Sequence, residues 1–246
     1  MNDDRVTVVT GAAGGIGAAV VARLLADGDT VIATDNNADG LSALRRDRPD
    51  AGRLLTIVAD ISREDDCDAV AQLARDRADR LDVLVNCAGY FPFRPFEQMT
   101  PGDWRQVIDI NLTGTFLMTR AAVPLMKQRG WGRIISFGSG GYFVGVPAQA
   151  HYIAAKAGIV GFSRSIAREL GQHGITVNVV TPGVTLTPNA KQTAPPALLE
   201  AQRRARGIHR DEYPEDLVGT VAFLASPDAA FITGQTINVD GGANAT

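Results

Sequence analysis

The sequence predicts one α/β domain over residues 1–246, in which a seven-stranded parallel sheet is doubly wound and carries helices on both faces. Three observations predict this fold. Short apolar segments alternate regularly with helical periodicities along the chain. Most of these segments are β-branched and lack polar alternation, as is typical of parallel strands buried on both faces. A glycine-rich turn joins the first apolar segment to the first helical pattern.

The strands are expected at Val6–Thr10, Thr30–Thr34, Leu54–Ala59, Val83–Asn86, Arg133–Phe137, Thr176–Val180 and Thr236–Val239. The helical patterns are Ile16–Ala26, Asp65–Ala78, Trp104–Gln128, Ala150–Gln172 and Glu215–Ala225. One long stretch, Pro182–Pro214, breaks the alternation, although Ala197–Arg206 within it is compatible with a short helix. Because a loop of this length in a compact domain is usually functional, we interpret Pro182–Pro214 as a mobile lid over a substrate.

The composition excludes several classes of function. A formal net charge of −3 over 246 residues gives no general attraction to nucleic acid or to an anionic membrane. No apolar stretch reaches the ~18 residues that span a bilayer, and we expect no secretory signal before the first strand. Cys67 and Cys87 lack the spacing of a metal site or a disulfide framework, and His151, His173 and His209 lack ligand spacing. We therefore predict a cytoplasmic protein with no metal.

The turn after the first strand is predicted to hold the phosphates of a dinucleotide. Its glycines permit a tight turn, close approach of the backbone to a pyrophosphate, and packing of helix against strand. The helix that begins there directs its first N–H groups at the phosphates. This is the pattern of a Rossmann-type domain. The residues expected at the cofactor are Gly11, Ala13, Gly15, Ile16 and Gly17.

Asp35 ends the second strand, about 20 residues beyond the glycine turn. A carboxylate at this place accepts hydrogen bonds from the adenosine ribose and repels a 2′-phosphate. The next residues, Asn36, Asn37 and Ala38, add no basic group. The sequence therefore predicts NAD rather than NADP.

Further residues follow the third and fourth strands, at the edge where ligands bind in open α/β sheets. We expect Asp60 and Ile61 near the adenine, although Asp60 is equally suited to capping the following helix. Asn86, Ala88 and Gly89 are also predicted to contact the cofactor.

Tyr152 and Lys156 stand four residues apart in a predicted helix, which places their Cβ atoms about 5–6 Å apart. A tyrosine ordinarily ionises near pH ~10 and is a poor proton carrier at neutral pH. Because a neighbouring positive charge favours the phenolate, we expect Lys156 to move the pKa of Tyr152 toward the neutral range.

Taken together, these motifs closely resemble those of the short-chain dehydrogenase/reductase family, over essentially the whole chain. Two departures, Cys87 for the family's usual asparagine and Gly138 for its usual serine, remove no reacting group. The resemblance is carried, in the family's order, by Thr10–Gly17, Asn86-Cys87-Ala88-Gly89, Asn111, Ser139, Tyr152-x-x-x-Lys156 and Pro182–Thr187.

The resemblance implies a role for each matching residue. Tyr152 would be the general acid/base and would also contact the cofactor, and Ser139 would hydrogen-bond the substrate oxygen. Lys156 would hold the nicotinamide ribose, and Asn111 would support a water that links Lys156 to solvent. The turn after the sixth strand would close over the nicotinamide carboxamide. Its residues are Pro182, Gly183, Val184, Thr185 and Thr187.

Aromatic side chains cluster where the family places its substrate. An apolar pocket suits an aryl or cyclic secondary alcohol, or its ketone, better than a sugar. Asn86–Phe96 and the segment Gly130-Trp131-Gly132-Arg133 particularly resemble NAD-dependent alcohol dehydrogenases that act on such alcohols. The predicted pocket residues are Phe91, Phe93, Gly140, Tyr142 and Phe143.

Two alternatives remain open. One is a 3-oxoacyl-[acyl-carrier-protein] reductase; such enzymes usually prefer NADPH, which Asp35 opposes, whereas Arg129 could meet an acidic carrier protein. The other is a catalytically silent NAD-sensing regulator. Such a protein would be expected to lose the active-site tyrosine or lysine, and both Tyr152 and Lys156 are present. The family resemblance also implies a homotetramer.

Overall fold

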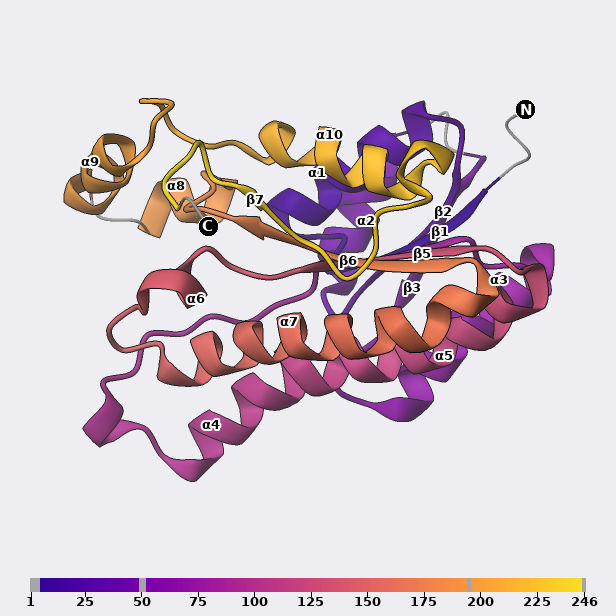
Figure 1. Ribbon diagram of the computed structural model, residues 1–246, viewed down its shortest axis with the longest axis horizontal. Coiled ribbons are helices and arrows are strands. Elements are labelled where there is room, and N and C mark those ends of the chain that lie inside the picture. The colour runs from indigo at the N-terminus through magenta and orange to yellow at the C-terminus, as the bar shows by residue number, and fades with distance from the viewer. Residues whose placement is uncertain (1–4, 49–51, 194–195, 245–246) are drawn as a thin grey trace.

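The computed structural model describes residues 5–48, 52–193 and 196–244. Seven parallel strands form one sheet in the order β3-β2-β1-β4-β5-β6-β7, which confirms the predicted fold (Figure 1). The order reverses between β1 and β4, and ligands bind at such a switch point in open α/β sheets. The strands are β1 (Val6–Thr10), β2 (Thr30–Asp35), β3 (Leu54–Val58), β4 (Val83–Asn86), β5 (Gly132–Phe137), β6 (Ile175–Pro182) and β7 (Thr236–Val239).

Helices connect the strands. They are α1 (Gly15–Ala26), α2 (Ala38–Arg46), α3 (Glu64–Ala78), α4 (Pro101–Ile108), a π-helical segment (Asp109–Thr113), α5 (Gly114–Arg129), α6 (Gly141–Val144), α7 (Ala150–Leu170), α8 (Pro188–Thr193), α9 (Pro196–Ala205) and α10 (Pro214–Ala225). Single 3-10 turns occupy Phe96–Gln98, Gly171–His173 and Pro227–Ala229. Within the described residues, no helix is both long and apolar enough to cross a membrane.

The sheet lies between two helical layers (Figure 1). Side chains from α1, α2 and α10 pack on one face, where Leu24, Leu44 and Val221 join a single apolar cluster. Side chains from α3, α5 and α7 pack on the other face, around Met118 and Leu170. Both faces of the central strands are therefore buried, which explains their continuous apolar sequences.

Helix α2 was not predicted. The Asn37 side chain accepts a hydrogen bond from the Gly40 backbone N–H at 3.0 Å and so caps the helix. Leu41 and Leu44, three residues apart, are buried against the sheet. The Asn37 N-cap and the two buried leucines therefore define this nine-residue helix.

The predicted helix Trp104–Gln128 is divided into α4, a π-helical segment and α5. Asn111 lies in the π-helical segment and is fully buried. Its Nδ2 donates to the Val107 carbonyl, four residues earlier, at 2.9 Å. Such single π turns inside α-helices occur frequently at functional sites.

The Pro182–Pro214 stretch is more ordered than the loop expected from sequence. It contains α8 and α9, and α9 confirms the short helix expected near Ala197–Arg206. Thr185 and Glu212, near its two ends, form an isolated parallel β-bridge. Residues 194–195 of this stretch lie outside the described residues.

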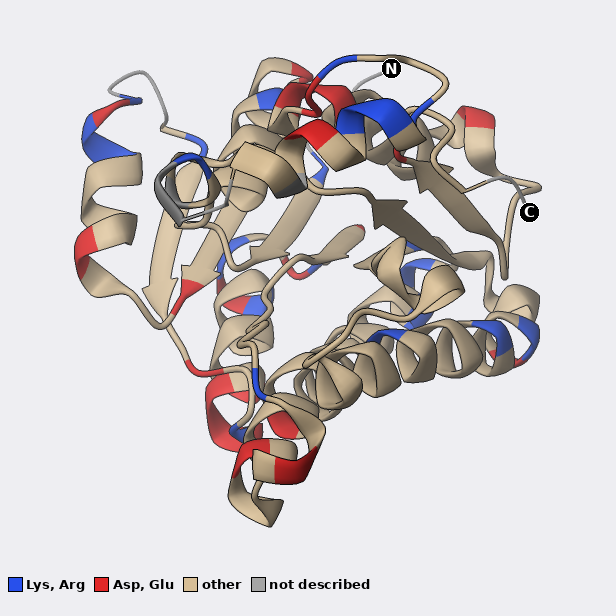
Figure 2. Ribbon diagram, turned by 90° about the vertical axis from the view of Figure 1, so that its left-hand side faces the viewer, with Lys and Arg blue, Asp and Glu red and all other residues tan. Residues whose placement is uncertain are grey.

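Partly buried ion pairs lie at the start of the central strands. Asp29, directly before β2, pairs with Arg5 at 2.7 Å, and Asp82, directly before β4, pairs with Arg80 at 2.7 Å. The predicted site residues lie at the opposite, carboxyl edge of the strands. Figure 2 shows that Lys and Arg are interspersed with Asp and Glu over the outer helices.

Candidate active site

The glycine turn after β1 is fixed by close backbone approaches. Gly11 has a φ of +66°, and a Cβ added there would lie 2.6 Å from the Ala88 Cα atom. A Cβ on Gly17 would lie 2.1 Å from the Gly11 carbonyl oxygen. Only glycine fits these two positions, because any side chain would clash with backbone atoms that cannot rotate away.

Helix α1 begins directly after this turn. Its N-cap residue, Gly14, provides no side-chain cap, and no acidic residue occurs in the first turn. The N-terminal N–H groups of a helix, together with its dipole, favour an anion. The structure of this turn therefore fits the pyrophosphate of a dinucleotide.

Asp35 is held across the glycine turn. Its Oδ2 accepts a hydrogen bond from the Ala13 N–H at 3.0 Å, and its Oδ1 accepts one from the Asn37 N–H at 3.0 Å. Two backbone donors therefore orient the carboxylate at the end of β2, where a Rossmann-type domain binds the adenosine ribose.

Asp60 and Ile61 have local roles in the structure. Asp60 Oδ1 accepts hydrogen bonds from the Ser62 N–H at 2.9 Å and the Ser62 hydroxyl at 2.7 Å, so it caps the turn before α3. The Ile61 side chain is buried and packs so closely on Gly114 that a Cβ there would lie 2.7 Å away. An adenine contact from these two residues stays a prediction.

The segment after β4 is tied to β1 through Thr10. The Thr10 hydroxyl accepts hydrogen bonds from the Cys87 and Ala88 N–H groups, both at 3.1 Å. The Asn86 amide nitrogen instead donates to the Thr119 and Ser136 hydroxyls at 3.2 Å. The predicted cofactor contact of Asn86 therefore does not involve this nitrogen, which points into the protein.

Cys87 is a packing residue in this arrangement. Burial raises the pKa of its thiol to about 12, so the sulfur stays protonated and unreactive at neutral pH. Cys87 is only partly buried, against the apolar cluster of α1, α2 and α10, where the sequence interpretation expected a buried small residue.

Ser139, Tyr152 and Lys156 come together as the sequence predicts. Ser139 lies two residues beyond β5, and Tyr152 and Lys156 lie in successive turns of α7. The Ser139 hydroxyl lies near the Tyr152 phenol and lowers its pKa. Lys156 Nζ donates to the Phe137 carbonyl at 2.8 Å and lies 5.6 Å from the centre of the Tyr152 ring. A hydroxyl pair and a buried ammonium thus share one site.

The expected direction of the Tyr152 pKa is wrong for the protein alone. Burial raises the pKa of Tyr152 to about 12, and the Ser139 hydroxyl opposes this increase only in part. Burial also lowers the pKa of Lys156 to about 8. Desolvation of the phenol therefore dominates, and Lys156, whose Nζ donates to the Phe137 carbonyl, does not offset it.

Asn111 reaches the same site from the π-helical segment. Its Oδ1 accepts from the Tyr90 N–H at 3.3 Å, and its Nδ2 donates to the Tyr90 carbonyl at 2.8 Å. A Cβ on Gly89 would lie 3.1 Å from Asn111 Oδ1 and 3.7 Å from Lys156 Nζ. Asn111, Gly89 and Lys156 therefore converge, as the family resemblance implies.

The turn after β6 lies between the other parts of the site. The Pro182 carbonyl accepts a hydrogen bond from the Gly140 N–H at 2.8 Å, beside Ser139. At its other end, a Cβ on Gly15 would lie 2.7 Å from the Thr187 Cβ atom. The predicted nicotinamide turn thus reaches from the catalytic loop to the start of α1.

Two of the predicted pocket residues, Phe91 and Phe93, are exposed aromatic rings. The Phe91 ring lies 6.0 Å from the Tyr152 ring and is 56% exposed. Phe93 is 64% exposed. Tyr142 and Phe143 pack on each other at 3.9 Å in the helix that follows Ser139 and Gly140.

Three residues near the site were missed by the sequence interpretation. Gln149 Nε2 donates to the Phe91 carbonyl at 3.1 Å and so fixes the backbone of that aromatic residue. Arg206 and Glu212 form a buried ion pair next to the turn after β6. No spacing or motif marks these residues, because the backbone groups that they bind, at Phe91, Gly183 and Val184, lie 22 to 58 residues away along the chain.

Comparison with known proteins agrees with this geometry. Residues 11–244 match the sequence model of a family described as Enoyl-(Acyl carrier protein) reductase. The chain is 40% identical to the 3-oxoacyl-[acyl-carrier-protein] reductase of Synechocystis, over 97% of this chain and 96% of the relative. It is 37% identical to the 2,3-dihydroxy-2,3-dihydro-p-cumate dehydrogenase of Pseudomonas putida, over 98% and 94% of the two chains.

A solved structure, that of levodione reductase, superposes with a TM-score of 0.88 at 30% identity, covering 97% of this chain and 96% of the other. The fold, the ordered motifs and these similarities lead to one assignment. The chain belongs to the short-chain dehydrogenase/reductase family of nicotinamide-dependent oxidoreductases.

Proposed function

We propose that the protein uses NAD to interconvert a hydrophobic aryl or cyclic secondary alcohol and its ketone. The observation that carries this proposal is the position of the Phe91 ring, 6.0 Å from the ring of Tyr152 and exposed beside it. An apolar surface next to the Tyr152 and Ser139 hydroxyls suits a substrate with one oxygen on an apolar body.

The residues divide the chemistry between them. When bound, nicotinamide supplies the hydride or accepts it. Tyr152 donates a proton to the ketone oxygen in reduction and, as the phenolate, takes the proton of the alcohol in oxidation. Ser139 holds the same oxygen by a hydrogen bond and stabilises the negative charge that develops on it. Lys156, fixed by the Phe137 carbonyl, supplies positive charge and a donor to the cofactor ribose.

Asp35 supports NAD as the cofactor. Its carboxylate is held by the Ala13 and Asn37 N–H groups, in position to accept from the ribose hydroxyls and to repel a 2′-phosphate. Asp35→Ala should therefore reduce the preference for NAD by roughly tenfold or more, since it removes the repulsion of one charge. Initial rates with NAD⁺ and NADP⁺ measure this ratio; an unchanged ratio would refute the assignment.

The substrate class is tested by NAD⁺ reduction with 1-phenylethanol, cyclohexanol and pyridoxine-type alcohols, with Tyr152→Phe as the inactive control. Turnover of aryl or cyclic alcohols, abolished by the substitution, is the expected result. NADH binding with no turnover over the whole panel would instead indicate the silent NAD-sensing protein.

A second candidate is a 3-oxoacyl-[acyl-carrier-protein] reductase. The similarity to the Synechocystis reductase, at 40% identity over nearly the whole chain, favours it. In this case Arg129, which is exposed at the end of α5, would contact an acidic carrier protein. Reduction of an acetoacetyl thioester with NADH and NADPH, compared with acetophenone, separates the two candidates.

We also propose that the protein is a cytoplasmic homotetramer, as the family resemblance implies. Sedimentation equilibrium of the purified protein tests the assembly, because the tetramer has four times the 26.0 kDa mass of the chain.

A further inference from the structure

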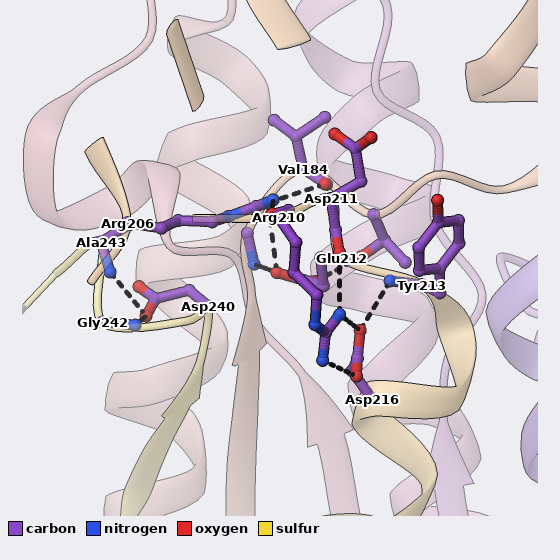
Figure 3. A network of polar contacts seen from close by, with 12 residues as sticks. Val184, Arg206, Arg210, Asp211, Glu212, Tyr213, Asp216, Asp240, Gly242 and Ala243 are labelled. Atoms are coloured by element: carbon purple, nitrogen blue, oxygen red, sulfur yellow. Dashed lines mark hydrogen bonds and ion pairs between the residues drawn. The ribbon is translucent and has the colours of Figure 1, made fainter. Parts of the chain in front are cut away.

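A buried ion pair lies behind the turn that follows β6. The side chains of Arg206 and Glu212 are 2% and 5% exposed, and their charged atoms are 3.4 Å apart (Figure 3). Neither residue belongs to the motifs of the family resemblance. Because burying two charges is costly unless both are well hydrogen-bonded, their other partners indicate what the pair does.

Glu212 holds the turn directly. Its Oε2 accepts a hydrogen bond from the Gly183 N–H at 3.1 Å, and its Oε1 accepts one from the Thr185 hydroxyl at 2.6 Å. Its backbone carbonyl accepts from the Leu186 N–H at 2.7 Å. One residue therefore fixes three positions of the turn.

Arg206 holds Val184, the residue between Gly183 and Thr185. Its Nη2 donates to the Val184 carbonyl at 2.9 Å, and its Nη1 donates to the Arg210 carbonyl at 2.8 Å (Figure 3). Arg210 in turn donates two hydrogen bonds of 2.6 Å to Asp216 at the start of α10. The turn is thereby connected through charged groups to a helix that packs on the sheet.

The turn and the carboxylate fit each other sterically. A Cβ on Gly183 would lie 2.8 Å from Glu212 Oε2. Glycine at this position thus permits the close approach of the carboxylate, in addition to its place in the family's motif. Burial raises the pKa of Glu212, and the hydrogen bonds from Thr185 and the charge of Arg206 oppose that increase.

We propose that Arg206 and Glu212 are positioning residues that preorganise the Gly183–Thr185 turn for the nicotinamide end of the cofactor. This inference rests on the proposed function. A turn that is ordered before binding loses less conformational freedom on binding, so the pair should contribute to affinity at that end alone. The adenosine and pyrophosphate end lies at the glycine turn and Asp35, which the pair does not contact.

The test compares two ligands by isothermal titration calorimetry. NADH contains the nicotinamide, whereas adenosine diphosphate ribose lacks it and reports only on the other end. Glu212→Gln keeps the side-chain shape but removes the charge that faces Arg206. We expect this variant to weaken NADH binding by about tenfold and to leave adenosine diphosphate ribose unchanged.

Glu200→Gln is the matched control, because Glu200 pairs with Arg204 at 3.0 Å on the exposed side of α9. It should alter neither dissociation constant. Arg206→Lys, which keeps the charge but loses the forked donor, should weaken NADH binding selectively and by less than Glu212→Gln, and it provides the test if Glu212→Gln does not fold.

The positioning role would be overturned if Glu212→Gln and Arg206→Lys both weakened the binding of the two ligands equally, or if both left the binding of the two ligands unchanged. Failure of the wild-type protein to bind either ligand would overturn the proposed function itself, and the positioning role with it.

Discussion

The turns after β1 and β6 meet where Gly15 faces Thr187, yet different forces hold them in shape. In the first, backbone atoms approach so closely that only glycine fits, as at Gly11. In the second, the Glu212 carboxylate binds the turn from 29 residues further along the chain. The first depends on local spacing and is visible in the sequence, whereas the second depends on the folded chain.

The two turns are expected to bind the cofactor, whereas proton transfer is expected at Tyr152, which lies outside both turns. Tyr152→Phe should therefore lower kcat by roughly 10²–10⁴, the usual contribution of a general acid/base, while the Kd for NADH changes far less. Steady-state kinetics and calorimetry check the two quantities. A variant that retains full kcat would place the proton path elsewhere.

The steric nature of the first turn is tested by Gly11→Ala. The added Cβ would lie 2.6 Å from backbone at a φ of +66°, so we expect NADH binding weaker by about 100-fold and unfolding easier by about 3 kcal/mol. Gly130→Ala is the matched control, since Gly130 has a φ of +64° with nothing within 4 Å. It should cost about 1 kcal/mol in urea unfolding and leave the Kd unchanged. Equal effects would show that backbone conformation, not contact, matters at Gly11.

The pH dependence of the rate tests the role of Tyr152 in proton transfer. Burial raises the pKa of Tyr152 to about 12, so the phenolate needed for oxidation increases as pH rises. Alcohol oxidation should increase about tenfold per pH unit from pH ~6 to ~8, whereas ketone reduction, which uses the protonated form, should not follow this increase. Above the pKa of Lys156, lowered to about 8, loss of the positive charge should reduce the slope. A plateau that begins near neutral pH would mean that bound cofactor lowers the pKa of Tyr152.

The smallest expected effect is on substrate binding, from a substitution in the predicted pocket. Phe91→Ala should raise KM for an aryl alcohol by roughly fivefold, corresponding to about 1 kcal/mol, and leave KM for 2-propanol unchanged. Phe231→Ala, at a fully exposed ring outside the predicted pocket, is the control. Equal changes for both alcohols in the Phe91 variant would contradict an aryl-binding role.

The sequence was sufficient for the sheet and for the residues that converge on the site. Buried parallel strands leave continuous apolar segments, and the Tyr152–Lys156 spacing is a property of any helix. The short helix α2 could also have been predicted, because Asn37 is a good N-cap and Leu41 and Leu44 follow at helical spacing.

Other features depend on burial, which spacing does not report. The pKa of Tyr152 moves upward because desolvation outweighs the opposing effect of the Ser139 hydroxyl, and the sequence contains no measure of desolvation. The pairing of Arg206 with Glu212 requires the Gly183–Leu186 segment to lie beside both. The π-helical turn at Asn111 leaves no residue pattern of its own.

That π-helical turn makes the site sensitive to chain length as well as to residue type. A π turn contains one residue more than the α-helical turn it replaces. Deleting a single residue within Asp109–Thr113 would allow continuous α-helical bonding and leave α4 and α5 in phase, but it would remove the wide turn that holds Asn111. The Asn111 link to Tyr90 would then be lost although the helix itself remained intact. For an alignment of relatives, a one-residue gap at this place is therefore a more serious change than most substitutions around it.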